Sequence, residues 1–236
     1  MQSENPYWLD ESYSTAITKS DIGMLGRNLQ MADVTKRLIL MCFNGTGKFI
    51  DYGGGYGIFV RLMRDQGFDF YRHDLLCENI FAEGFEAHAD EKYDLLTAWE
   101  VFEHLVDPLA EIEKMLNYSE NIFFSTVLMP SSPKPLDQWW YYGLEHGQHV
   151  SFYTRETLRF ISKKHNLKLH HSSSAVHLMG RKQIHPLKTR IVFGRRLGLL
   201  RGMLSQRTPG SLLEQDFHHI TGHFLRDTKP PGSRKG

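Results

Sequence analysis

Short apolar runs and helically spaced apolar residues alternate along the first two thirds of the chain. The short runs are bounded by turn-forming residues and predict strands at 48–52, 68–73, 85–89, 93–99 and 121–127. Apolar residues with helical spacing predict helices at 26–42, 58–66 and 109–116. Strands that alternate with helices are typical of an α/β fold with a doubly wound sheet, which binds ligands beyond the carboxyl ends of its strands.

The pattern after residue 150 predicts how this sheet ends. Thr154 is a suitable N-cap for a helix over residues 155–165. Residues 167–173 and 175–179 then predict a β-hairpin, which brings the expected number of strands to seven, the last of them antiparallel. With helices on both faces, the predicted fold is a Rossmann-like sheet.

Length and composition limit the functions that are open to this chain. A chain of 236 residues is long enough for one main domain with appendages, and a net charge of +1 argues against nucleic acid as a partner. The two cysteines, Cys42 and Cys77, are not spaced as metal ligands and indicate a reducing compartment. The polar N-terminus and the lack of a long apolar run favour a cytoplasmic protein, whereas the oligomeric state is left open.

Four glycines follow the first predicted strand. The stretch 51–57, DYGGGYG, matches neither a phosphate P-loop nor the dinucleotide fingerprint, which would require glycine in place of Ile58. It keeps an acid followed by spaced glycines at a strand end, where backbone N–H groups can face a ligand. Asp74, at the end of the second strand, is placed to accept hydrogen bonds from ribose hydroxyls. The alternatives are a glycine turn without a ligand and an aspartate that only caps a helix.

The spacing Asp51-x-Gly53-x-Gly55-x-Gly57 resembles the first motif of the class I S-adenosylmethionine (SAM) methyltransferases. This resemblance implies a SAM-binding core over residues 46–180 and a helical N-terminal lid over residues 1–45, in which Tyr13 is a candidate contact. The cofactor-binding residues that it implies are Asp51, Gly53, Gly54, Gly55, Gly57, Asp74, Asp90 and Trp99.

A second group of polar residues follows the fourth predicted strand. If the chain turns into a helix there, Glu100, Glu103 and His104 share one face. Such a group predicts a divalent metal site, a general base for an acceptor hydroxyl, or a capped helix start without a chemical role.

The string EVFEHLVDP, residues 100–108, resembles a motif of ubiquinone-pathway O-methyltransferases and of small-RNA 3′-end 2′-O-methyltransferases. This resemblance implies that Glu100, Glu103 and His104 bind Mg²⁺ or Mn²⁺ together with a later histidine, either His149 or His146. The expected catalytic residues are then His104, His149 and Glu100.

Two further segments lie outside the core pattern. Residues 130–150 are rich in proline and aromatic residues, including Trp139 and Trp140, and predict either a lid over the acceptor or a small satellite core. Residues 181–236 form a basic extension that ends in a flexible tail. This extension predicts either a helix docked on its own domain or weak contact with an anionic membrane surface.

Several stretches between residues 7 and 179, including PYWLDE, DYGGGYG, EVFEH and GQHVSFYT, resemble bacterial methyltransferases of polysaccharide and lipopolysaccharide biosynthesis. This resemblance implies methyl transfer to a hydroxyl of a small molecule, most plausibly a sugar or glycan precursor. The alternatives are methyl transfer to a quinol or an RNA terminus, and a non-catalytic scaffold that binds SAM.

Overall fold

The computed structural model describes residues 22–132, 134–143, 149–171, 175–181, 183–194 and 208–224. Tyr13, His146 and the C-terminal tail, for which the sequence predicts a lid contact, a metal ligand and flexibility, lie outside these residues. None of the helices in the described ranges is long and apolar enough to cross a bilayer.

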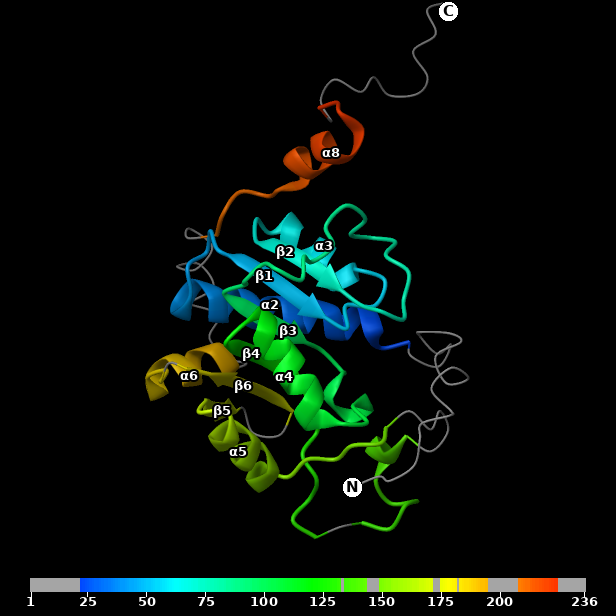
Figure 1. Cartoon of the computed structure of the whole chain (residues 1–236), viewed down its shortest axis with the longest axis vertical. Coiled ribbons are helices and arrows are strands. Elements are labelled where there is room, and N and C mark those ends of the chain that lie inside the picture. Colours follow the sequence, from blue (N-terminus) through cyan, green and yellow to red (C-terminus); the bar gives the residue numbers. More distant parts are fainter. Residues whose placement is uncertain are drawn as a thin grey trace, which may run out of the picture.

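A mixed sheet of six strands, in the order β2-β1-β3-β4-β6-β5, forms the centre of the molecule (Figure 1). Its strands are β1 Lys48–Tyr52, β2 Asp69–His73, β3 Leu95–Ala98, β4 Asn121–Ser125, β5 Lys168–His171 and β6 Val176–Gly180. The first four are parallel, and β6 is antiparallel to both β4 and β5. The doubly wound α/β sheet with an antiparallel last strand is therefore confirmed, and the strand order reverses beside β1, where such sheets bind ligands.

The strand predicted at 85–89 is wrong, and the sheet has six strands instead of seven. This segment makes one isolated bridge, in which Arg72 N–H donates to the Phe85 carbonyl at 2.8 Å and Ala87 N–H donates to the Arg72 carbonyl at 2.8 Å. The next amide, His88 N–H, donates to the Tyr93 hydroxyl at 3.0 Å. Ala87 N–H is the amide that faces β2, and Glu91 N–H then donates to the His88 carbonyl at 3.2 Å, so the chain turns away from the edge of the sheet after a single pair.

The helices over residues 24–42, 58–65, 108–118 and 155–164 lie close to where the sequence predicts them. The helices in the described ranges are α2 Met24–Cys42, α3 Ile58–Asp65, α4 Pro108–Tyr118, α5 Arg155–Lys164, α6 Pro186–Phe193 and α8 Leu213–Thr221, with 3₁₀ turns η1 Phe102–His104 and η2 Trp140–Tyr142. Asp107 caps α4 by accepting from Ala110 N–H at 3.1 Å, and Thr154 caps α5 by accepting from Thr157 N–H at 3.1 Å. The predicted cap at Thr154 is therefore confirmed.

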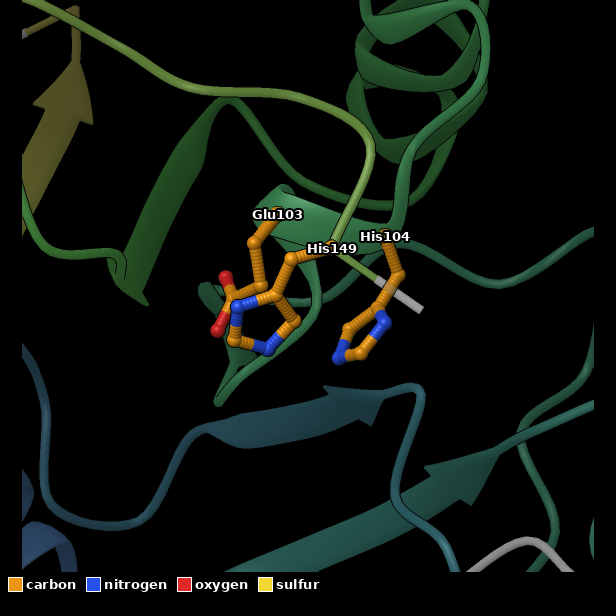
Figure 2. A group of neighbouring side chains, drawn as sticks. All are labelled: Glu103, His104 and His149. Atoms are coloured by element: carbon orange, nitrogen blue, oxygen red, sulfur yellow. The ribbon is translucent and has the colours of Figure 1, made fainter. Parts of the chain in front are cut away.

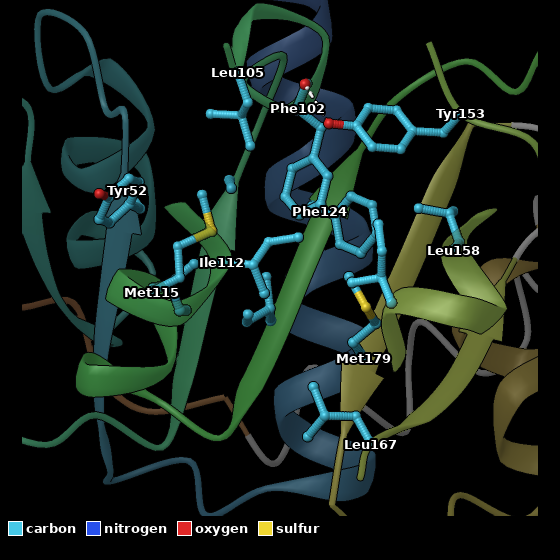
Figure 3. Close-up of a cluster of buried hydrophobic side chains, with 14 of the residues drawn as sticks. Tyr52, Phe102, Leu105, Ile112, Met115, Phe124, Tyr153, Leu158, Leu167 and Met179 are labelled. Carbon is cyan, nitrogen blue, oxygen red and sulfur yellow. Dashed lines mark hydrogen bonds between the residues drawn. The ribbon is translucent and has the colours of Figure 1, made fainter. Parts of the chain in front are cut away.

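Alternating side chains of the strands build two apolar cores, one on each face of the sheet. On β4, Ile122 and Phe124 face the core under α4 and α5, whereas Phe123 faces the core under α2, α3 and α6. Figure 3 shows the first of these cores, in which the rings of Phe102 and Phe124 stack with centroids 3.8 Å apart. This stacking attaches η1 to the carboxyl end of β4, so the core itself positions the turn that carries Glu103 and His104.

The described part of the basic extension docks on this sheet. Val192 of α6 is buried against α2, and its carbonyl accepts from the guanidinium of Arg37 at 3.0 Å. Helix α8, for which the apolar pattern gives no prediction, lies beyond β2 and α3 (Figure 1). It is held by Asp216, whose carboxylate accepts two hydrogen bonds from the buried guanidinium of Arg64.

Candidate active site

The glycine turn joins β1 to α3 and contains all four predicted glycines. Gly53 has φ 70°, and a Cβ there would lie 2.6 Å from Val101 Cγ2, so a side chain is excluded by both conformation and space. Gly55 has φ 53°, but a Cβ there would meet nothing within 4 Å. Gly54 and Gly57 complete the turn. The turn therefore packs tightly on Val101 at Gly53 and is open at Gly55.

Asp51 is buried at the carboxyl end of β1. Its Oδ1 accepts a hydrogen bond of 2.6 Å from the Thr97 hydroxyl on the neighbouring strand β3. Burial raises the pKa of Asp51 to about 7, although the bond from Thr97 lowers it in part. The Asp51 side chain is thus buried next to the glycine turn and is not directed into solvent.

Asp74 lies at the same end of the sheet, one residue beyond β2. Its Oδ2 accepts from Gly55 N–H at 2.8 Å, and its Oδ1 accepts from the N–H groups of Leu76 and Cys77 at 2.8 and 2.9 Å. Since Tyr52 pairs with His73, Asp74 follows β2 exactly where Gly53 follows β1. Within the described ranges, Oδ2 accepts only the bond from Gly55 N–H and keeps a second lone pair, so the group can still accept from a ligand hydroxyl.

The other two predicted cofactor residues differ in their surroundings. Asp90 is exposed in the turn before β3. Trp99 directly follows β3, and its ring packs edge-on against Phe59 and Phe123 with centroids 5.7 and 5.0 Å away. Its indole Nε1 is buried and has no hydrogen-bond partner among the described residues. A buried donor without a partner is costly, so Trp99 carries a stronger indication of a ligand contact than Asp90.

Three of the predicted catalytic and metal residues lie together. The side chains of Glu103, His104 and His149 each offer a ligand atom within 4.8 Å of the other two. Figure 2 shows that the carboxylate and both imidazoles are turned toward a shared space. We call these three residues the acid–histidine cluster.

Backbone hydrogen bonds hold the two halves of the acid–histidine cluster together. The Glu103 carbonyl accepts from Val150 N–H at 2.8 Å and from Ser151 N–H at 2.9 Å. Two residues further on, the Tyr153 hydroxyl donates to the Phe102 carbonyl at 2.8 Å. The segment that begins at His149 is therefore fixed on η1, and the relative position of the histidines is a property of the fold.

The orientation of His149 determines which ring nitrogen can act as a base or ligand. Its Nδ1 lies 2.6 Å from the Tyr141 carbonyl, and a carbonyl can only accept, so Nδ1 carries the proton. In the neutral ring, Nε2 then has the lone pair. A histidine oriented in this way is suited to receive a proton or bind a cation.

Glu103 is completely buried, and neither of its carboxylate oxygens has a hydrogen-bond partner among the described residues. The hydroxyls of Thr126 and Tyr141 lie near enough to favour the ionised form slightly, but they bond each other at 3.2 Å instead. Burial, followed by the charge of Glu100, raises the pKa of Glu103 to about 8. A cation or an imidazolium in the cluster would favour the carboxylate.

Glu100 is not part of the acid–histidine cluster. It has φ 54°, a left-handed conformation that a non-glycine residue rarely adopts. Its N–H donates to the Ser125 hydroxyl at 2.8 Å, and that hydroxyl donates to Glu100 Oε1 at 2.5 Å. These two hydrogen bonds attach Glu100 to the end of β4. In the sequence, Glu100 lies between β3 and η1.

The sequence did not predict the roles of three side chains around the site, although Tyr141 belongs to the aromatic segment 130–150. Ser125 orients Glu100, whereas Thr126 and Tyr141 pack on Glu103. Ser125 and Thr126 could have been found as polar residues at the carboxyl end of a buried strand. Tyr141 also orients His149 through its backbone carbonyl, a role for which side-chain patterns hold no signal.

The raised pKa of Asp51 predicts a pH-dependent stability. Because the folded state favours the protonated acid, its contribution to the free energy of unfolding is complete below pH 3.8 and lost as pH rises through about 7. The quantity to compare is the melting temperature of Asp51→Asn minus that of the parent chain. We expect this difference to be roughly 4 °C or more higher at pH 8 than at pH 4. The measurement is thermal unfolding at both pH values, and an equal difference at both would contradict the assignment. Thr97→Val should enlarge the loss of stability with rising pH, because it removes the hydrogen bond that lowers the pKa of Asp51.

Comparison with known proteins places these observations in a family. A family model described as a methyltransferase domain matches residues 26–172. No curated protein matches the chain. Among solved structures, the plantazolicin methyltransferase BpumL with bound SAH is 16% identical, with a TM-score of 0.49 over 83% of this chain and 89% of that one.

Two other solved structures are more distant. CalO1, a methyltransferase in calicheamicin biosynthesis, is 14% identical with a TM-score of 0.44. The mitomycin 7-O-methyltransferase MmcR is 12% identical with a TM-score of 0.42. In each comparison the match covers 68% of this chain but only 57% of the other. Likenesses at this level say nothing about the acceptor of this chain.

The family match covers more than half of the chain and contains both the glycine turn and η1. The order of the sheet and its antiparallel last strand agree with it. The chain therefore belongs to the methyltransferase domain family.

Proposed function

We propose that this enzyme transfers the methyl group of SAM to a hydroxyl of a small molecule, with a sugar or glycan precursor as the acceptor. The observation that carries this proposal is the position of the acid–histidine cluster. Val101, which packs on Gly53 of the glycine turn, directly precedes η1, and its carbonyl accepts from His104 N–H at 3.0 Å. The glycine turn, which would bind the methyl donor, and η1, which carries two residues of the acid–histidine cluster, are thus joined through Val101.

The chemistry requires alignment and a proton acceptor. The acceptor oxygen attacks the methyl carbon, the bond from that carbon to sulfur breaks, and S-adenosylhomocysteine leaves. The hydroxyl proton passes to an imidazole, for which His149 Nε2 is oriented by the Tyr141 carbonyl. Glu103, beside both histidines, stabilises the imidazolium that results.

An exposed aromatic residue next to the cluster supports a sugar as the acceptor. Trp140 is 78% exposed, and its ring lies 5.4 Å from that of Tyr141. An exposed indole offers a flat apolar surface that can stack on the apolar face of a sugar ring. The same surface could accept a quinol, so the acceptor class needs a direct test.

That test is a methyl-transfer screen on sugar nucleotides, glycans, quinols and RNA 3′ ends with labelled SAM. We expect a methyl ether on a sugar hydroxyl, and Trp140→Ala should raise KM for that acceptor more than it lowers kcat. Label on a quinol or RNA end alone would replace the proposed acceptor. SAM binding without transfer to any acceptor would favour the scaffold alternative.

The acid–histidine cluster also fits a divalent ion. Two imidazoles and one carboxylate are suitable ligands for Mn²⁺ and similar ions. A cation would also satisfy the buried carboxylate of Glu103, which has no hydrogen-bond partner in the part of the chain that the structure describes. Glu103, His104 and His149 would hold it, whereas Glu100 is bonded to Ser125. A bound ion would lower the pKa of the acceptor hydroxyl.

The two versions of the site predict different responses to metal removal. If an ion is needed, EDTA should lower methyl transfer by about 10²-fold or more, and Mn²⁺ or Mg²⁺ should restore it. If an imidazole alone removes the proton, activity should persist in EDTA and fall at low pH as the histidine becomes protonated. If an ion is needed, Glu103→Gln should also abolish metal binding, as measured by calorimetric titration.

A further inference from the structure

Charge is distributed very unevenly along this nearly neutral chain. Residues 157–213 contain no Asp or Glu but hold 12 of the 28 Lys and Arg residues. The remainder of the chain has 16 Lys and Arg against 27 Asp and Glu. A basic segment of this length indicates an anionic partner even though the net charge is small.

The structure places the described part of this segment around the free edge of β5. Two adjoining hollows, of about 390 and 360 Å³, lie between β5 and the helices α5 and α6, and both are lined by His171 and Gln183. Lys and Arg side chains line them from three elements: Arg159 and Lys163 from α5, Lys168 from β5, and Arg190 from α6. No acidic side chain lines them among the residues that the structure describes. We call these four Lys and Arg residues the basic face.

The cations of the basic face are available to a partner. Arg159 lies 3.6 Å from Glu156, but the two side chains are 59% and 77% exposed, so this pair is weak. Lys163, Lys168 and Arg190 are exposed and make no ion pair among the described residues. Four positive charges therefore lie along one edge of the sheet, and within the described ranges only Arg159 has an acidic partner, in a weak and exposed pair.

Exposed apolar side chains accompany these charges. Phe160 on α5 is 64% exposed and Leu187 on α6 is 60% exposed. Each lies three residues before a cation of the basic face, Lys163 or Arg190, and so shares its helix surface. Cations mixed with exposed apolar groups are typical of surfaces that bind anionic lipid bilayers.

We propose that the basic face, together with Phe160 and Leu187, binds the surface of an anionic membrane. Nucleic acid fits less well, because residues 157–213 contain only two aromatic residues, Phe160 and Phe193, on which bases could stack. The sequence that follows α6, RRLGLLR at 195–201, instead combines three arginines with three leucines. Lipid headgroup phosphates meet the cations, and the apolar side chains enter the interface.

Vesicle cosedimentation with the full chain tests this proposal. We expect binding to vesicles with 30% phosphatidylglycerol, little binding to pure phosphatidylcholine vesicles, and a loss of about tenfold or more in affinity between ~50 and ~300 mM salt. Arg159→Gln, Lys163→Gln and Arg190→Gln together should weaken binding roughly 100-fold. A matched variant with Lys92→Gln, Lys114→Gln and Lys134→Gln should bind like the parent chain.

Other results would overturn the proposal. If the two triple variants bind vesicles equally well, the basic face is not the binding surface. If binding does not depend on phosphatidylglycerol, the attraction is not electrostatic. An RNA or DNA oligomer that binds more tightly than the vesicles and displaces the chain from them would make this a nucleic-acid surface. Circular dichroism of each variant confirms that it is folded, and the assay contains no SAM, so it is independent of the proposed reaction.

Discussion

Replacing His149 with alanine is expected to lower kcat by about 10²–10⁴-fold while SAM affinity stays within about threefold. The reason is that His149 is oriented for proton transfer, with Nδ1 bonded to the Tyr141 carbonyl, but belongs to a segment outside the glycine turn. His104→Ala should act in the same direction, because its ring lies 5.0 Å from that of His149. The measurements are steady-state methyl transfer and a SAM titration for each variant.

The control is His218→Ala, which removes an exposed histidine on α8. It should leave kcat unchanged. Added imidazole that partly restores His149→Ala would support a role in proton transfer. If kcat is unchanged in His149→Ala, this residue has no part in the reaction, and if SAM affinity is lost together with kcat, its role is structural.

The second large effect is expected on stability. Asp216→Ala should lower the free energy of unfolding by about 3–5 kcal/mol, because it leaves the Arg64 guanidinium buried without its main partner. The two side chains are 3% and 6% exposed, and two hydrogen bonds of 2.8 and 2.9 Å join them. Urea unfolding measures the change.

Asp65→Ala is the matched control. The Asp65 carboxylate pairs with Arg61 but is 44% exposed. Its removal should therefore lower the free energy of unfolding by less than about 1 kcal/mol. The double replacement Arg64→Met with Asp216→Leu should recover most of the stability, because no charge is then left buried. A loss below about 1 kcal/mol in Asp216→Ala would mean that α8 separates from α3 and water solvates Arg64.

Sequence reasoning worked where the signal is local. The strand, the glycine turn and the helix over residues 48–65 are contiguous, and Asp51 and Gly53 are fixed by spacing alone. Glu103 and His104 are adjacent in the sequence, so their proximity needed no knowledge of the fold. His149 joins them in the structure because its segment is bonded to η1, an arrangement that the sequence indicated only through resemblance.

The predictions were less successful where tertiary contacts decide the structure. Residues 100, 103 and 104 were expected on one helical face, but the helical turn η1 begins only at Phe102 and Glu100 is bonded to Ser125. The predicted strand at 85–89 does not form because the chain turns away from β2, with Glu91 N–H bonded to the His88 carbonyl. The pair of Arg64 with Asp216 joins residues 152 positions apart, and no periodicity reports such a contact.

The central claim is that the glycine turn and Asp74 bind SAM, and calorimetric titration of SAM into the full chain tests it most directly. The account predicts saturable binding of one SAM per chain, weakened about tenfold or more by Asp74→Ala. A parent chain that shows no binding, or a variant that binds SAM as tightly as the parent chain, would contradict it.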